Sequence, residues 1–221
     1  AFAAEISDNR VFVECKAGFA SEMVTGLIKL NGATVGVVGN RQTGKESLLT
    51  ADGCGKAADF VRFCDAFDIP VLSLTNVTGY EATIASEKLL TREAARMTVA
   101  FAEASVPKIN FITKEAYGSA YVLMNSKALG ADLVYAYDTA KIGIMDSALA
   151  AKIMYEDKSA DEISEKAKEF EELQSGIAAA AARGYVDRII TPADTRKYLI
   201  AGFEMLFTKR TDGPFKKHST K

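Results

Sequence analysis

The residues best suited to chemistry in this sequence lie in one short segment, Ala116–Tyr121. The pattern predicts a strand before this segment and a short helix after it, with two small residues, Gly118 and Ser119, at the junction. Small side chains let backbone N–H groups approach a ligand closely, and the N-terminus of a helix favours negative charge. Main-chain donors alone could therefore form an oxyanion hole here. Taken by itself the pattern is weak, because small residues at such junctions also serve packing.

A second segment, Gly39–Lys45, fits the first seven positions of the phosphate-binding motif GxxxxGK. The eighth position needs a Ser or Thr hydroxyl for Mg²⁺, but here it is Glu46. A carboxylate would repel phosphate, and the next good helix start comes only at Asp52. We therefore predict a Gly-rich loop over Gly39–Gly44 rather than a nucleotide site.

Histidine and cysteine usage restricts the possible chemistry further. The only histidine is His218, in a Lys-rich tail, so a Ser-His-Asp triad, a Cys-His dyad or a His-ligated zinc is not expected. Cys15, Cys54 and Cys64 fit neither a zinc pattern nor a CxxC motif. We expect reduced, buried thiols and no bound metal.

The bulk composition is that of an ordinary globular protein. Of 221 residues, 48% are hydrophobic and 25% are charged, and the net charge of −2 gives no basic surface for nucleic acid. No apolar run reaches the ~20 residues that span a bilayer, and the start of the chain has no signal-peptide pattern. We expect a cytoplasmic protein that binds no nucleic acid and does not insert into a membrane.

The order of predicted elements indicates the fold class. Strands are expected at Val11–Glu14, Thr25–Leu30, Thr34–Val38, Val71–Leu74, Lys108–Thr113, Asp132–Tyr137 and Lys141–Met145. Helices are expected at about 53–67 with Asp52 as cap, at 83–104, at 160–182 and after a cap at Thr191. Asn31-Gly32 predicts a hairpin turn. This alternation predicts an α/β domain over 1–221 with a mostly parallel sheet, followed by a loose basic tail at 209–221.

Several segments, in order, resemble the β-type carboxyltransferase subunits of biotin-dependent acyl-CoA carboxylases and decarboxylases (propionyl-, methylmalonyl- and glutaconyl-CoA types). Tyr117–Tyr121, with Met124–Lys127 and Gly130–Asp132, is similar to the family pattern AYGGAY…M.SK..GAD. The other matching segments are Ala17–Ala20 with Val24–Gly26, Val35–Asn40, Lys56–Phe60 with Phe63–Pro70, Gly184–Asp187 with Pro192–Arg196, and the tail around Lys216–His218. The resemblance runs from about residue 11 to 218, over the C-terminal half of the family's subunit.

The resemblance implies a crotonase-like (ClpP/crotonase) superhelix of ββα units with C-terminal helices. It implies transfer of CO₂ between carboxybiotin and the α-carbon of a short-chain acyl-CoA, without a metal. The implied cofactor is biotin on a biotin carboxyl carrier protein. The implied partners are an N-terminal carboxyltransferase half, without which this chain would be inactive, and other subunits of a homo- or hetero-oligomer.

The resemblance also assigns roles to residues. Ser119 and Ala120 would donate backbone N–H groups to the biotin ureido oxygen, and Gly118 would shape the turn. The biotin and substrate groove would be lined by Asn76, Thr78, Gly79, Tyr80, Tyr117, Tyr121 and Met145.

The sequence departs from the family pattern in three places. Ser119 replaces the second Gly, Asn76–Tyr80 lacks the Asp and Pro of DVPGF, and Asp146–Ala150 replaces a Gly-rich stretch. We expect each change to affect a loop that lines the groove.

Two other functions compete with the carboxyltransferase half. One is a catalytically silent binding or assembly module of a biotin-dependent complex. The other is a self-contained hydratase or isomerase using Glu115, which the sequence singles out as the acid near the turn. Several questions stay open from the sequence: the acyl-CoA used, the direction of the reaction, and whether the chain is a natural split subunit or a truncated one.

Overall fold

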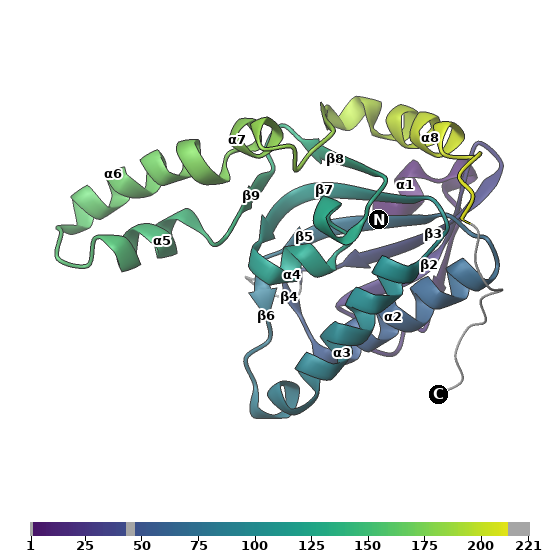
Figure 1. Ribbon diagram of the computed structural model, residues 1–221, viewed down its shortest axis with the longest axis horizontal. Helices are drawn as coiled ribbons and strands as arrows, with labels where there is room; N and C mark the ends of the chain where they lie inside the picture. Colours follow the sequence, from purple (N-terminus) through teal and green to yellow (C-terminus); the bar gives the residue numbers. More distant parts are fainter. Residues whose placement is uncertain (1, 43–46, 212–221) are drawn as a thin grey trace.

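The computed structural model describes residues 2–42 and 47–211, and within them an eight-stranded sheet carries helices on both faces (Figure 1). The spatial order is β1-β2-β3-β5-β7-β8-β10, with β9 paired to β7. The strands are β1 (Phe12–Cys15), β2 (Met23–Leu30), β3 (Ala33–Asn40), β5 (Val71–Val77), β7 (Lys108–Tyr117), β8 (Leu133–Tyr137), β9 (Lys141–Gly143) and β10 (Arg188–Ile190). Strands β1 to β3 pair antiparallel and the rest pair in parallel, which confirms the predicted α/β class.

The predicted hairpin between β2 and β3 is confirmed. Asn31 and Gly32 have φ values of 51° and 81°, the left-handed backbone that a two-residue hairpin turn requires. The loop expected over Gly39–Gly44 is wrong at its start, because β3 continues through Asn40, which pairs with Met23. Residues 43–46, including Glu46, lie outside the described part of the chain, so the reading of this segment as a loop stays a prediction.

Helices α2 (Ala51–Ala66) and α3 (Ile84–Glu103) cover one face of the sheet (Figure 1). The cap of α2 is Thr50, whose hydroxyl accepts a hydrogen bond from the N–H of Gly53 at 2.9 Å. The predicted cap Asp52 is wrong, since this residue already lies in the first helical turn.

The expectation of reduced, buried thiols is confirmed for Cys54 and Cys64 and is wrong on burial for Cys15. Cys54 and Cys64 are fully buried and unpaired, and Cys15 is half-buried and also free. Burial raises the pKa of the Cys54 and Cys64 thiols to about 12, so both stay protonated and unreactive.

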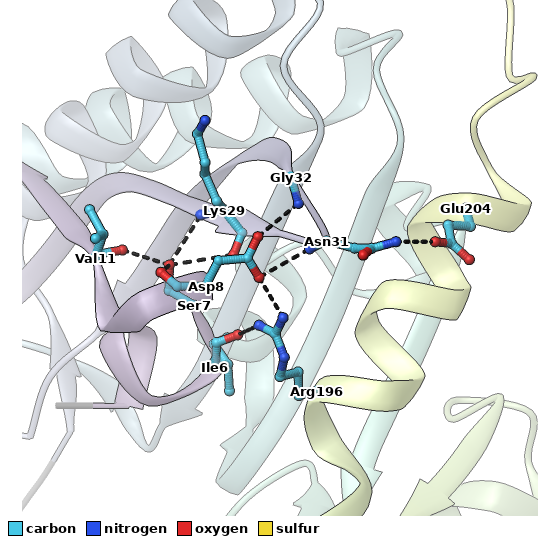
Figure 2. Close-up of polar contacts among 9 residues, drawn as sticks. All are labelled: Ile6, Ser7, Asp8, Val11, Lys29, Asn31, Gly32, Arg196 and Glu204. Atoms are coloured by element: carbon cyan, nitrogen blue, oxygen red, sulfur yellow. Dashed lines mark hydrogen bonds and ion pairs between the residues drawn. The ribbon is translucent and has the colours of Figure 1, made fainter.

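Helices α1 (Phe2–Ile6) and α8 (Thr195–Met205) cover the opposite face. The N-terminal segment, for which the sequence predicted no element, is tied to α8 through Asp8 (Figure 2). Its carboxylate accepts hydrogen bonds from the N–H groups of Asn31 (3.1 Å) and Gly32 (2.7 Å) and from the guanidinium of Arg196. These three hydrogen bonds tie the N-terminal segment to the β2–β3 turn and to α8.

The helical segment expected after Thr191 is present, but it begins with a 3₁₀ turn and lacks the expected side-chain cap. The Thr191 hydroxyl donates to the Asp194 carboxylate at 3.0 Å instead of capping the helix, and a 3₁₀ turn, Pro192–Asp194, precedes α8. Leu199 and Phe203 of α8 are buried. The part of the tail from residue 212 on, including His218, lies outside the described residues.

A helical arm, formed by α5 (Ser147–Met154) and α6 (Ala160–Phe170), projects from the body (Figure 1). The groove loop expected at Asp146–Ala150 is wrong, because Asp146 caps α5. Its carboxylate accepts hydrogen bonds from the N–H groups of Ala148 (3.0 Å) and Leu149 (3.2 Å). Helix-forming residues then continue α5 to Met154.

The single helix expected over about 160–182 is broken. After α6, a π-helical turn (Glu171–Ser175) leads to Gly176, whose backbone is extended, and α7 (Ile177–Ala182) follows. Gly176 also forms an isolated bridge with Lys141 of β9. The break lets the chain turn back from the arm to the sheet.

Three short elements complete the region around the candidate site. These are β4 (Leu48–Leu49), β6 (Gly79–Tyr80) and α4 (Gly118–Leu123). Gly79 of β6 pairs in parallel with Leu48 of β4. Among the helices of the described residues, none is long and apolar enough to cross a membrane.

Candidate functional site

The candidate site is the turn where β7 ends and α4 begins. Tyr117 is the extended N-cap residue, and Gly118 follows with φ of +60°, a conformation that residues with a Cβ rarely adopt. Ser119 has no such positive φ, so a residue with a side chain fits there. The departure from Gly at position 119 therefore leaves the backbone of the turn unstrained.

Helix α4 presents its first N–H groups at this turn. The first turn of a helix has N–H groups without an intrahelical partner, and the Tyr117 side chain makes no capping hydrogen bond to them. Ala120 and Tyr121 are buried, whereas Ser119 is exposed. Ala120 and Tyr121 thus anchor the turn in the core while Ser119 faces solvent, an arrangement that suits anion binding by main-chain N–H groups.

Tyr80 of β6 reaches this turn from a neighbouring segment. A hydrogen bond from the Ser119 hydroxyl to the Tyr80 phenol links the two residues. Burial raises the pKa of Tyr80, and the Ser119 hydrogen bond opposes that rise. The phenol is therefore neutral and can donate its own proton to a ligand.

Asn76 and Thr78 hold the segment before Tyr80 in place. The Asn76 amide donates to the Ser47 hydroxyl at 3.1 Å and accepts from the N–H of Glu115 at 3.2 Å. The N–H of Thr78 donates to the Ser47 carbonyl oxygen at 2.8 Å. The sequence predicts that Asn76 and Thr78 line the groove. The hydrogen bonds above join both residues to Ser47, and Asn76 also to Glu115. Ser47, which the sequence did not single out, joins both of them.

Two tyrosines beside the turn are buried. Burial is the main reason that the pKa of Tyr117 lies well above its usual range and that the pKa of Tyr121 is about 12. Neither phenol ionises near neutral pH. Met145 is half-buried just after Ile144, whose carbonyl oxygen faces Gly118.

Three acidic residues lie near Tyr117, and only Glu115 among them was predicted from the sequence. Glu115, Asp146 and Glu171 each contribute electrostatically to the raised pKa of Tyr117. Glu171 is paired with Lys141 at 2.9 Å. The view that Glu115 is the only nearby acid is wrong, because the arm brings Asp146 and Glu171 to this place from later in the chain.

Among the residues that the structure describes, no group of three or more His, Cys, Asp or Glu side chains could hold a metal ion. A cavity of about 930 Å³ does exist, but it lies at the other end of the sheet. Its walls include Val35, Pro70 and Pro107, at the starts of parallel strands. Ligands of open α/β sheets bind at the carboxyl ends of the strands, where the turn at Gly118 lies.

Comparison with known proteins identifies the family. A model of the carboxyl transferase domain matches residues 2–220. The chain belongs to the carboxyl transferase family. It is 42% identical to a putative propionyl-CoA carboxylase beta chain of Bacillus subtilis, over 97% of this chain and 44% of that protein. It is 40% identical to the methylmalonyl-CoA carboxyltransferase 12S subunit of Propionibacterium freudenreichii, over 97% of this chain and 42% of that subunit.

Solved carboxyl transferases share the fold. Transcarboxylase 12S, a hexamer whose crystal structure holds methylmalonyl-coenzyme A and methylmalonic acid, superposes with a TM-score of 0.90 at 38% identity, over 98% of this chain and 43% of that one. The beta subunit of geranyl-CoA carboxylase from P. aeruginosa gives a TM-score of 0.80 at 24% identity, over 96% and 43% of the two chains, a likeness of fold alone. The expected crotonase-like fold is confirmed. The chain spans less than half the length of these relatives.

Proposed function

We propose that this chain is the biotin-side half of a carboxyltransferase that moves CO₂ between carboxybiotin and the α-carbon of a short-chain acyl-CoA. The turn at Gly118 carries the proposal, because the Tyr117 side chain does not cap the first N–H groups of α4 and Ser119 in its first turn is exposed. The two relatives named for propionyl-CoA and methylmalonyl-CoA support thioesters of that size as substrates.

The residues of the turn fit a biotin ureido group. That group has a carbonyl oxygen, an acceptor that matches two adjacent N–H donors, and when carboxylated it supplies the activated carboxyl group. The N–H groups of Ser119 and Ala120 would bind this oxygen and stabilise its negative charge. One preorganised donor of this kind contributes about 3–4 kcal/mol to transition-state stabilisation. The neutral Tyr80 phenol and the buried Tyr117 ring would limit access of water.

The partner we propose for this half is the N-terminal half of a carboxyltransferase, which would supply most of the acyl-CoA site. The arm offers a surface for it, since Leu149, Ile153 and Met154 are 51%, 62% and 53% exposed. This surface continues toward the turn through Ile144, which is 78% exposed. Apolar side chains gathered in this way mark an interaction site. A biotin carboxyl carrier protein would bring the biotin.

The same arm favours one second candidate, a silent binding or assembly module. Helix α5 stands where the sequence led us to expect a groove loop, and its apolar residues suit docking whether or not chemistry occurs. The two candidates differ in turnover and not in association.

A reconstitution assay tests the proposal. Release of decarboxylated acyl-CoA from malonyl-, methylmalonyl- and glutaconyl-CoA would be measured with free biotin present. The chain would be assayed alone and mixed with the N-terminal half of the Bacillus subtilis relative. We expect activity only in the mixture, with methylmalonyl-CoA preferred.

The other outcomes of this assay are equally informative. Activity of the chain alone would refute the half-site proposal. Silence of a mixture whose two halves associate would establish the assembly module.

A further inference from the structure

A cluster of four polar side chains lies beneath α4, inside the core. Ser73 and Thr75 come from β5, Asn110 comes from β7, and Asn125 follows Met124, the C-cap residue of α4. All four residues are 0% exposed. Ser73 and Asn110 are partners in the register of the two strands, and Thr75 lies two residues beyond Ser73 on the same face.

The cluster binds the C-terminal end of α4 to the sheet at two points. The Thr75 hydroxyl donates to the carbonyl oxygen of Met124 (3.3 Å) and to the amide oxygen of Asn110 (2.7 Å), which share its one hydrogen. The Asn125 amide donates to the Ser73 hydroxyl at 3.1 Å. Asn125 has φ of +60°, a left-handed conformation that Asn tolerates better than most residues.

Stability does not account for this cluster. Within the described part of the chain, Asn110 Nδ2 and Asn125 Oδ1 have no hydrogen-bond partner. An unsatisfied buried polar group destabilises the folded state, and apolar residues of the same shape would serve stability at least as well. A buried polar cluster that destabilises the fold but forms directional hydrogen bonds is suited to hold a neighbouring element in one orientation.

We propose that Thr75 and Asn125 are positioning residues, which set the orientation of α4 and thereby the direction of the Ser119 and Ala120 N–H groups. This inference rests on the proposed function. Helix α4 has six residues, so its two ends are only about 9 Å apart and move together. Buried Ala120 and Met124 anchor α4 to the core through apolar contacts, which are not directional. The two hydrogen bonds add a directional restraint on the rotation of α4.

A matched pair of Thr→Val substitutions tests the inference. The Thr75 hydroxyl donates to Met124, the C-cap residue of α4, whereas the Thr113 hydroxyl donates to the Thr75 carbonyl oxygen at 3.2 Å. Backbone amide resonances of Ser119 and Ala120 would be recorded by NMR on the full chain. We expect Thr75→Val to shift both resonances and Thr113→Val to leave both in place. Asn125→Gly, which keeps the left-handed backbone and removes the amide, should act like Thr75→Val.

The kinetic measurement uses the reconstituted mixture. We expect Thr75→Val and Asn125→Gly to lower kcat at least tenfold with KM for acyl-CoA unchanged, because the acyl-CoA site lies on the other half. Unchanged Ser119 and Ala120 resonances in both variants would overturn the inference. An inactive wild-type mixture would refute the proposed function, while the resonances would still decide whether the cluster orients the turn.

Discussion

A Cβ atom on Gly118 would lie 3.1 Å from the backbone carbonyl oxygen of Ile144. The turn at the candidate site and the base of the arm therefore limit each other, because Ile144 directly follows β9 and leads into α5. The left-handed backbone of Gly118 adds a second restriction, which holds whatever space is available.

We predict that Gly118→Ala lowers both stability and activity. Because alanine is strained in the left-handed conformation of residue 118, the free energy of unfolding should fall by about 1–2 kcal/mol, measured by urea denaturation. The displaced turn should also lower CO₂ transfer in the reconstituted mixture at least tenfold. Gly184→Ala is the control, since Gly184 has φ of +77° and open space around its Cβ position. It should lose similar stability and keep its activity; equal loss of transfer in both variants would deny the turn a special role.

Two substitutions of Ser119 separate its backbone from its side chain. Ser119→Pro removes the N–H but places proline in the first turn of α4, where helices accept it. We expect this variant to remain folded and to lose transfer about 10²–10³-fold, the effect of removing one oxyanion donor. Ser119→Ala keeps the N–H and loses the hydrogen bond to Tyr80, so its rate should stay within a few-fold of wild type. Similar rates for the two variants would exclude the Ser119 N–H as a donor.

Local patterns were enough to predict the parts of the fold that local chemistry decides. Asn31-Gly32 specifies its own turn, and the apolar run at Val71 specifies a buried strand. Thr50 and Asp52 are both good capping residues two positions apart, so sequence alone could not choose between them. The Asp146 cap and the helix-forming residues after it are typical of a helix, but the resemblance to a family with a Gly-rich stretch at this place favoured a loop.

The candidate site was predictable only in its central turn. Gly118 and Ser119 were found because their neighbours in sequence are also their neighbours in space. Ser47 and Asn76 are 29 residues apart, and no periodicity links them. Asp146 lies near Tyr117 because β9 pairs with β7, and Glu171 does so because the chain returns from the arm to β9 at Gly176. Such contacts depend on the tertiary fold.

The Asp8 contacts predict a pH dependence of stability. Hydrogen bonds from the N–H of Gly32, then the Arg196 side chain, hold the pKa of Asp8 below its usual value. A depressed folded-state pKa gives stability that is present above the unfolded-state pKa of about 4 and is lost as the pH falls through the folded-state value. We expect Asp8→Asn to lower the urea midpoint at pH 7, and the difference from wild type to shrink below pH ~4.

Glu5→Gln is the matched control for Asp8. Glu5 forms an ion pair with Arg10 in which both side chains are more than half exposed, and such pairs contribute little. This variant should keep the wild-type midpoint at both pH values. An Asp8→Asn difference that stays constant down to pH 2 would mean that the ionised carboxylate is not what stabilises the N-terminal segment.

The exposed face of the arm predicts how the two halves associate. Leu149 and Ile153 are four residues apart in α5, so both side chains lie on one face, and both are more than half exposed. Glutamate at both positions should leave the chain folded but weaken binding to the N-terminal half at least tenfold, because charged groups would be buried without partners. Glu165→Lys, on an exposed position of α6, changes charge on the same arm and should bind as wild type. Calorimetric titration of the two halves measures all three affinities, and unchanged binding by the double variant would place the interface elsewhere on the molecule.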